Sequence, residues 1–383
     1  MPAEEVREIF VSTFGKEPRL FFSPGRINLI GEHIDYNDGF VMPAAIDKGI
    51  WFAVAANNTD SVNFYSIDLK EKYSTTLQHI KPVNGWQNYL LGIVDQVQKK
   101  QLNISGFDCC FGGNLPVGAG LSSSAAVECG LLFALNEIFQ LKLSRIDIAV
   151  MAQGAEHTFP KVMCGIMDQF ASAMGKKEHV LLLDCQNLDY RYLPLKLDDY
   201  TWVLINSKVH HSLADGEYNK RRKQCQEGFT ILQQHLPKAK SFRHIKSERV
   251  IAHQHNLEPI IYNRCLFVTQ EIERTQKAAI LLENNELKAF GKLMYDTHEG
   301  LSKLYEVSCP ELDFLVEKTK EKSSIIGSRL MGGGFGGCTL NLILKRDWSA
   351  TIQEITTAYK TAFDIDAEVY EVGVGDGTYE VNK

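Results

Sequence analysis

Hydrophobic periodicity divides the chain into a first half that mixes strands and helices and a second half richer in helices. Apolar residues at helical spacing and β-prone apolar runs locate the expected elements. In the first half we predict helices near 6–10, 86–97, 125–135 and 148–157, and strands at 20–22, 27–30, 40–56, 62–65, 107–111 and 179–184. In the second half we predict helices at 217–235, 259–280, 284–304 and 310–321, and strands at 201–205, 338–344 and 368–374. The pattern indicates a mixed α+β protein.

The chain is longer than a single hydrophobic core usually serves. It has 383 residues, and chains of that length commonly fold as two domains, each with its own core. The clearest change in pattern falls around 190–205, so we predict one lobe over 1–195 and a second over 196–383. Binding sites form preferentially between such units, which makes the cleft between the lobes the expected site.

Composition and charge restrict the class of partner. Hydrophobic residues make up 44% and charged residues 23% of the chain, as in ordinary soluble globular proteins. The net charge of -6 disfavours nucleic acid. The nine cysteines are scattered without a C-x-x-C pair, which is typical of core residues in a reducing compartment. No apolar run reaches membrane-spanning length and the acidic start shows no signal region. We expect a cytoplasmic protein with no membrane or nucleic-acid partner.

A glycine- and serine-rich stretch runs from Gly113 to Gly130, between a predicted strand and a predicted helix. Gly118 and Gly120 allow sharp turns and close approach of a ligand to the backbone. The serines at 122–124 lie where the helix begins, and free N–H groups and the helix dipole there favour anions. The stretch is neither a Walker A loop nor a dinucleotide fingerprint. A phosphate loop and a plain turn with a serine cap both remain open from these residues alone.

A second polar stretch, Pro24–Asn37, places Glu32, His33 and Asp35 within four residues, close to Arg26. Carboxylates and imidazole form hydrogen bonds with vicinal hydroxyls, which suits a sugar ligand. The alternative is a polar turn whose charges pair with one another.

Three stretches taken together resemble the signature motifs of the GHMP small-molecule kinases, in the same order along the chain: Pro24–Asn37, Gly113–Gly130 and Met331–Thr339. The first is similar to the signature of the galactokinase family within that group, and so are Cys164–Gln169 and Ser212–Cys225. The resemblance extends from about Phe21 to Thr339. It implies an N-terminal lobe similar to domain 2 of ribosomal protein S5, a C-terminal GHMP kinase lobe, and an active site in the cleft between them.

The resemblance implies that Asp168 is the catalytic base and that Arg26 lies beside it. A nearby cation keeps a carboxylate ionised and favours negative charge on a transferring phosphoryl group. Without the resemblance, Asp168 is equally compatible with a helix cap. Ser124 and Glu156 are implied as ligands of Mg²⁺, which prefers oxygen donors; the alternative for Glu156 is a solvated helix residue.

The remaining site residues are also implied by the resemblance. Those expected at the sugar are Glu32, His33, Ile34, Asp35, Gly165 and Tyr218, and those expected at ATP are Ser66, near the adenine, and Gly118, Ala119, Gly120, Leu121, Ser122, Ser123 and Ser124. Ile34 departs from the threonine usual in the family. Tyr218 has the alternative of a half-buried helix residue, and we interpret the basic run Lys220–Lys223 as a solvated face. We expect Gly332–Gly337 to pack close to the first glycine loop.

The implied activity is transfer of the γ-phosphoryl group of MgATP to the anomeric hydroxyl of α-D-galactose. The products are galactose 1-phosphate and ADP, as in the entry step of galactose catabolism (the Leloir pathway), and the expected enzyme is a monomer. One alternative is a kinase of the same build that acts on N-acetylgalactosamine or arabinose. Another is a non-catalytic sugar sensor, which the intact sequence Ser124–Ala126 and the pair of Arg26 and Asp168 disfavour. A nucleic-acid binder on an S5-like fold is disfavoured by the acidic charge.

Overall fold

The computed structural model describes residues 3–116, 118–210 and 214–381. Two long neighbouring strands, β1 (Arg19–Asn28) and β3 (Pro43–Ala56), form the centre of a sheet with the order β13-β1-β3-β6-β4-β5. Its other strands are β4 (Ser61–Ser66), β5 (Glu71–Thr76), β6 (Phe107–Gly113) and β13 (Tyr379–Glu380). The pairing of β4 with β6 is parallel and the other pairings are antiparallel.

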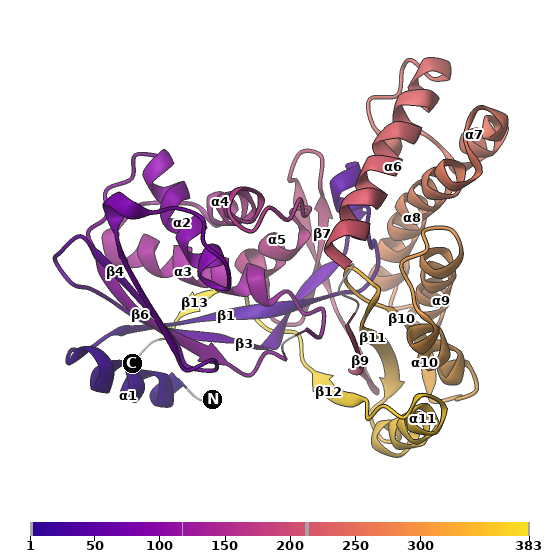
Figure 1. Ribbon diagram of the computed structural model, residues 1–383. Coiled ribbons are helices and arrows are strands. Elements are labelled where there is room, and N and C mark those ends of the chain that lie inside the picture. Colours follow the sequence, from indigo (N-terminus) through magenta and orange to yellow (C-terminus); the bar gives the residue numbers. More distant parts are fainter. Residues whose placement is uncertain (1–2, 117, 211–213, 382–383) are drawn as a thin grey trace.

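Helices cover both faces of this sheet, because successive side chains along a strand point to opposite faces and apolar side chains occur on both. In Figure 1 the helices of one face lie above the sheet and α1 lies below it. The upper helices are α2 (Gln87–Lys99), α3 (Ser123–Phe139), α4 (Arg145–Thr158) and α5 (Met167–Met174), and the lower is α1 (Ala3–Phe14). Phe52 and Val54 belong to the main core, whereas Ala53 packs with Val6 and Phe10 of α1.

The second half is built on a sheet with the order β10-β11-β9-β12. Its strands are β9 (Tyr200–His210), β10 (Ile325–Leu330), β11 (Gly336–Leu344) and β12 (Glu368–Val372). Trp202 and Leu204 of β9 join the main core, whereas Val203 and Ile205 join a second cluster with α11. A third, small sheet consists of β2 (Phe40–Val41), β7 (His179–Asp184) and β8 (Tyr190–Pro194), and only its last two strands directly precede β9 in the chain.

Helices surround the second sheet on the side of the molecule away from α1 (Figure 1). They are α6 (Ala214–His235), α7 (Ser247–Ala252), α8 (Pro259–Glu283), α9 (Leu287–Lys303), α10 (Pro310–Lys320) and α11 (Trp348–Phe363). Short 3-10 turns are η1 (Asp35–Asn37), η2 (Leu77–His79), η3 (Phe242–His244) and η4 (Gln254–Asn256). Helix α9 packs on β10, and the glycine-rich turn connects β10 to its neighbour β11.

The structure confirms the α+β class and most of the predicted elements. The capping pair Ser144 and Asp147 forms a complete capping box at the start of α4. The two predicted strands around Pro24 are one strand, because the chain continues through a register shift between Pro24 and Arg26. The strands β5, β8, β10 and β13 and the helices α5 and α7 were not predicted.

The predicted boundary near residue 195 falls in the connection between β8 and β9. We propose that the lobes divide there, with one addition: β13 pairs with β1, so the last described residues lie on the sheet of the first lobe. All nine cysteines are free and most are buried. In the described part of the chain, no helix has the length and apolar character needed to cross a membrane.

Candidate active site

One cavity gathers side chains from segments that are far apart in the sequence. We call it the central cavity. The predicted residues that line it are Arg26, Glu32, His33, Asp35, Gly165, Asp168 and Tyr218. Cys164, Met167, Gly332 and Gly333 complete the lining. The structure thus brings together the catalytic pair and the sugar-binding residues that the sequence predicts, with the exception of Ile34.

Arg26 and Asp168 form a bidentate ion pair at one wall of the central cavity. Arg26 Nε lies 2.7 Å from Asp168 Oδ1 and Nη2 lies 2.9 Å from Oδ2. The arginine is only 4% exposed. Its burial by itself lowers the pKa, but the nearby carboxylates of Asp168, Glu32 and Asp35 raise it above the ordinary value. The guanidinium therefore stays charged and holds Asp168 in a fixed orientation.

The same arginine joins this pair to the glycine loop. Arg26 Nη1 donates to the carbonyl of Gly120 at 2.6 Å, and the Arg26 backbone N–H donates to the carbonyl of Leu121 at 3.1 Å. The Ser122 hydroxyl donates to Asp168 Oδ2. Loop, arginine and aspartate are consequently a single hydrogen-bonded unit, and Ser122 has a partner other than a phosphate.

The glycine loop has the backbone conformation that its sequence predicts. Gly118 and Gly120 have φ values of 72° and 70°, in the left-handed region that glycine tolerates. Ser122 precedes α3 with φ 60° and its side chain makes no capping hydrogen bond. The first-turn N–H groups of α3 are therefore not capped by that side chain, as an anion site at a helix N-terminus requires. Gly332 lies against this loop: an added Cβ there would meet the Gly120 carbonyl at 3.2 Å.

Glu32 is fixed by a residue that sequence reasoning missed. Arg329 Nη2 donates to Glu32 Oε2 at 2.9 Å, and the Gly332 N–H donates to the same oxygen at 3.1 Å. Arg329 is fully buried in β10 and also donates to the carbonyl of Leu29 at 3.0 Å. The available signal was a single arginine inside the apolar run 325–330, because a buried cation needs a partner.

His33 is held as a neutral imidazole with a defined tautomer. Burial lowers its pKa to about 4. Its Nε2 lies 3.2 Å from the Gly333 carbonyl, which only accepts, so Nε2 carries the hydrogen. Nδ1 therefore accepts a hydrogen bond from the Tyr36 hydroxyl at 2.7 Å. Tyr218 lies beside this histidine with ring centroids 5.5 Å apart.

Asp35 carries an elevated pKa in the central cavity. Its pKa is raised to about 7, chiefly by burial and also by the neighbouring carboxylates of Asp168 and Glu32, against backbone hydrogen bonds that lower it. Gly165 gives this side chain its space, because a Cβ at 165 would lie 1.9 Å from Asp35 Oδ2. The absence of a side chain at 165 is therefore a requirement of the site.

Ser124 and Glu156 are hydrogen-bonded to each other, and Glu156 lies close enough to Asp168 to be affected by its charge. Burial raises the pKa of Glu156 to about 7 and the charge of Asp168 adds to the shift, whereas hydrogen bonds from Cys164, Ser124 and Gln169 oppose it. Gln169 Nε2 donates to Glu156 Oε2 at 2.6 Å. Glu156 is thus a buried residue rather than a solvated one. Oxygen donors in an excess of negative charge are the environment that a hard cation prefers.

The structure differs from the expectations for Ile34 and for the basic run, and it does not test the expectation for Ser66. Ile34 is fully buried in the hydrophobic core and does not line the central cavity. Ser66 is buried at the end of β4 and is likewise not part of that lining, so its place at the adenine stays a prediction. The basic run is not simply solvated: Arg221 is buried and donates to the carbonyls of Tyr305 and Glu306, both at 2.7 Å. In the family stretch 212–225, residues 212–213 lie outside the described residues.

Comparison with known proteins agrees with this geometry. The galactose-binding signature of galactokinases matches residues 8–56, the N-terminal domain of GHMP kinases matches 88–176, and their C-terminal domain matches 278–355. The galactokinase of Thermotoga petrophila is 38% identical over 94% of this chain and 99% of its own. That of Clostridium perfringens is 38% identical over the whole of both chains. The crystal structure of Lactococcus lactis galactokinase complexed with galactose superposes with a TM-score of 0.95 at 31% identity, covering 99% of each chain.

The fold, the glycine loop and the Arg26–Asp168 pair define a small-molecule kinase of the GHMP class. Mevalonate kinases share that fold, at 20% identity and a TM-score of 0.64 for one of them. The identity with full-length relatives is more specific: the chain belongs to the galactokinase family.

The close approach at Gly165 generates a prediction about sugar binding. We expect Gly165→Ala to displace the Asp35 carboxylate, because the new methyl group occupies its position, and to weaken galactose binding by at least about tenfold, the cost of one charged hydrogen bond. Gly216→Ala is the matched control, since nothing lies within 4 Å of a Cβ there. Isothermal titration calorimetry with galactose checks both variants. Unchanged affinity in folded Gly165→Ala protein would contradict the role given to this glycine.

The elevated pKa of Asp35 generates a prediction about stability. Its folded-state pKa of about 7 lies above the value of 3.8 for an unperturbed aspartate, so stability is lost as pH rises from 3.8 to about 7 and the loss is complete above that pH. We expect Asp35→Asn to remove this loss and to raise the free energy of unfolding by roughly 2 kcal/mol more at pH 8 than at pH 5. Urea titrations at the two pH values measure it, with exposed Asp60→Asn as the control. An equal effect at both pH values would show that Asp35 titrates normally.

Proposed function

We propose that this protein transfers the γ-phosphoryl group of ATP to the anomeric hydroxyl of α-D-galactose. The products are galactose 1-phosphate and ADP, which is the entry step of galactose catabolism. The observation that carries the proposal is the ion pair of buried Arg26 with partly exposed Asp168, which is hydrogen-bonded to the glycine loop and lines the same cavity as the sugar-signature residues. Membership of the galactokinase family agrees with it.

Asp168 accepts the proton of the attacking hydroxyl in this proposal. The adjacent Arg26 guanidinium orients the carboxylate and places positive charge near the transferring group. Phosphoryl transfer needs alignment and electrostatic stabilisation more than covalent participation by the protein. The rigid unit of loop, arginine and aspartate supplies that alignment, because the base and the loop cannot move independently.

Recognition of the sugar falls to Glu32, His33, Asp35 and Tyr218. Among the described residues, both donors that hold Glu32 bind Oε2, which leaves Oε1 to accept a hydroxyl hydrogen. The fixed tautomer of His33 and the protonation of Asp35 near neutral pH add donors and acceptors of defined direction. Gly165 contributes space, and Ile34 acts through the core that supports this segment.

The phosphates of ATP bind the loop formed by residues 118–124 in this proposal, with Ser66 near the adenine. Ser124 and Glu156 would hold a Mg²⁺ ion, whose charge neutralises the phosphates when it is bound. Within the described part of the chain, no group of three or more His, Cys, Asp or Glu side chains is suited to hold a metal. Two protein ligands suffice for an ion that ATP also binds. We further propose a cytoplasmic monomer.

The substrate assignment predicts an order among sugars. Galactose should give a higher kcat/KM than N-acetylgalactosamine, arabinose or glucose, because Glu32, His33, Asp35 and Tyr218 match the galactose signature. Release of ADP at fixed MgATP, measured with each sugar in turn, tests the order. Faster turnover of another sugar would contradict the assignment. Galactose binding by calorimetry without ADP release from any sugar would indicate a sensor instead of an enzyme.

A further inference from the structure

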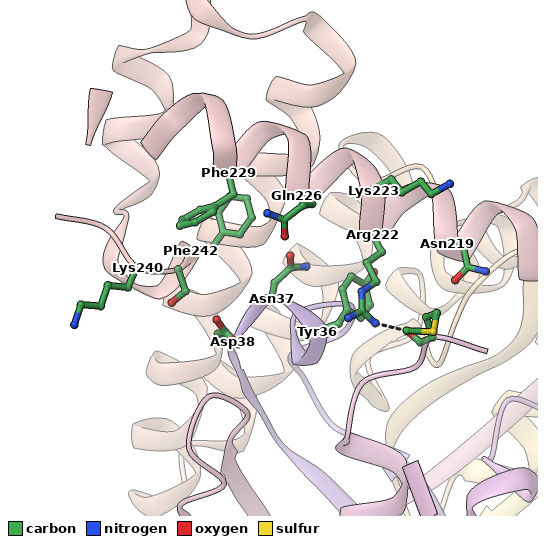
Figure 2. A pocket seen from close by; sticks show the side chains of 12 residues that line it. Tyr36, Asn37, Asp38, Asn219, Arg222, Lys223, Gln226, Phe229, Lys240 and Phe242 are labelled. Atoms are coloured by element: carbon green, nitrogen blue, oxygen red, sulfur yellow. Dashed lines mark hydrogen bonds between the residues drawn. The ribbon is translucent and has the colours of Figure 1, made fainter. Parts of the chain in front are cut away.

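A second cavity of about 640 Å³ lies beside the central cavity, between the turn η1 and the helix α6. Figure 2 shows it from close by, with Asn37 and Asp38 of the turn below the helix and Gln226 and Phe229 on the helix above them. Its size is that of ordinary small-molecule sites. The reaction proposed above does not use it, and we call it the side cavity.

Three cations surround the side cavity without an acidic partner. Arg222, Lys223 and Lys240 line it, and none of them forms an ion pair with the residues that the structure describes. Arg222 Nη1 donates to the Met163 carbonyl at 2.6 Å, and Lys223 and Lys240 extend from opposite ends of the cavity (Figure 2). In a chain with a net charge of -6, such a local excess of positive charge attracts a small anion.

The rest of the lining suits a ring that carries hydroxyl groups. The rings of Phe229 and Phe242 lie 5.3 Å apart and form an apolar wall. The amide of Gln226 lies next to Phe229 on α6, and the amide of Asn37 and the carboxylate of Asp38 lie below the helix, so that all three offer donors and acceptors to a ligand. Amides and carboxylates bind hydroxyls, whereas aromatic faces pack against the C–H face of a sugar ring.

The side cavity also touches the residues that position the sugar site. The Tyr36 hydroxyl, at its border, bonds His33 Nδ1, and Asn37 Nδ2 donates to the His33 carbonyl at 2.9 Å. Met163, which Arg222 holds, directly precedes Cys164 of the central cavity. A ligand in the side cavity therefore contacts the supports of the central cavity without entering it.

We propose that the side cavity is a second binding site for a phosphorylated sugar. The guanidinium of Arg222 binds the phosphate with the donors that the Met163 carbonyl does not take. Lys223 and Lys240 attract the anion electrostatically from the two ends of the cavity, and the amides, Asp38 and the aromatic wall bind the sugar. Galactose 1-phosphate is the natural probe, a choice that rests on the proposed function because that function makes it the product.

The test separates this site from the central cavity by filling the latter. Enzyme saturated with galactose and a non-hydrolysable ATP analogue is titrated calorimetrically with galactose 1-phosphate, glucose 1-phosphate or inorganic phosphate. We expect both sugar phosphates to bind, and inorganic phosphate to bind at least about tenfold more weakly because it lacks the ring and its hydroxyl contacts.

Charge reversal of the lysines at the two ends of the side cavity tests their role in binding. We expect Lys223→Glu with Lys240→Glu to weaken galactose 1-phosphate binding by at least about tenfold and to remove its salt dependence. Lys238→Glu with Lys277→Glu is the matched control, with the same charge change on exposed lysines that do not line the cavity. The control should bind as the unmodified protein does.

Three results would overturn the proposal: no binding to the filled enzyme, equal weakening in both double variants, or inorganic phosphate binding as tightly as the sugar phosphates. Galactose turnover is measured on the same preparations. Failure of the proposed function would appear as absent turnover, whereas failure of this inference would appear as absent binding in an enzyme that turns galactose over.

Discussion

The ion pair between buried Arg26 and partly exposed Asp168 is the interaction on which the site depends. A buried arginine is costly unless its charge and donors are satisfied. Here Asp168 takes two of the donors and the carbonyl of Gly120 takes a third. The pair therefore fastens β1, α5 and the glycine loop to one another. Any movement of the loop would leave a buried charge without its partners, so the unit is rigid before a substrate arrives.

A concentration of carboxylates surrounds this pair and explains the unusual protonation in the site. Asp35 and Glu156 both have pKa values raised to about 7, and burial raises the pKa of Glu128 behind them well above its ordinary range. Burial is the largest cause for each, and mutual repulsion adds to it. This loss of stability falls at the place where the proposed function requires hydroxyl groups and a cation to bind, which is common for functional sites.

The sequence predicted the α+β class and most of the elements, because apolar periodicity reports burial directly. Its motifs located the residues of the central cavity through family resemblance; the residues alone left a sugar site and a self-paired turn open. Contacts between residues far apart in the chain could not be predicted from the sequence. Arg329 meets Glu32 across 297 positions, and Ser122 bonds Asp168 rather than capping its helix. Ile34 stands between residues of the central cavity in the sequence, but its side chain packs in the hydrophobic core, a placement that depends on the tertiary structure. The basic run was misread because burial of Arg221 depends on α6 packing against residues 305–306.

The central claim is that Asp168 is the base and that Arg26 acts with it as a unit. The most direct measurement is turnover, with calorimetric galactose binding, for Asp168→Asn, Arg26→Ala and the double variant. Loss of a general base typically costs about 10²–10⁴-fold in rate, so kcat of Asp168→Asn should fall by that order while galactose still binds. The double variant should lose less than the product of the two single losses, since neither residue performs its role without the other. Near-normal turnover in folded Asp168→Asn protein would contradict the account.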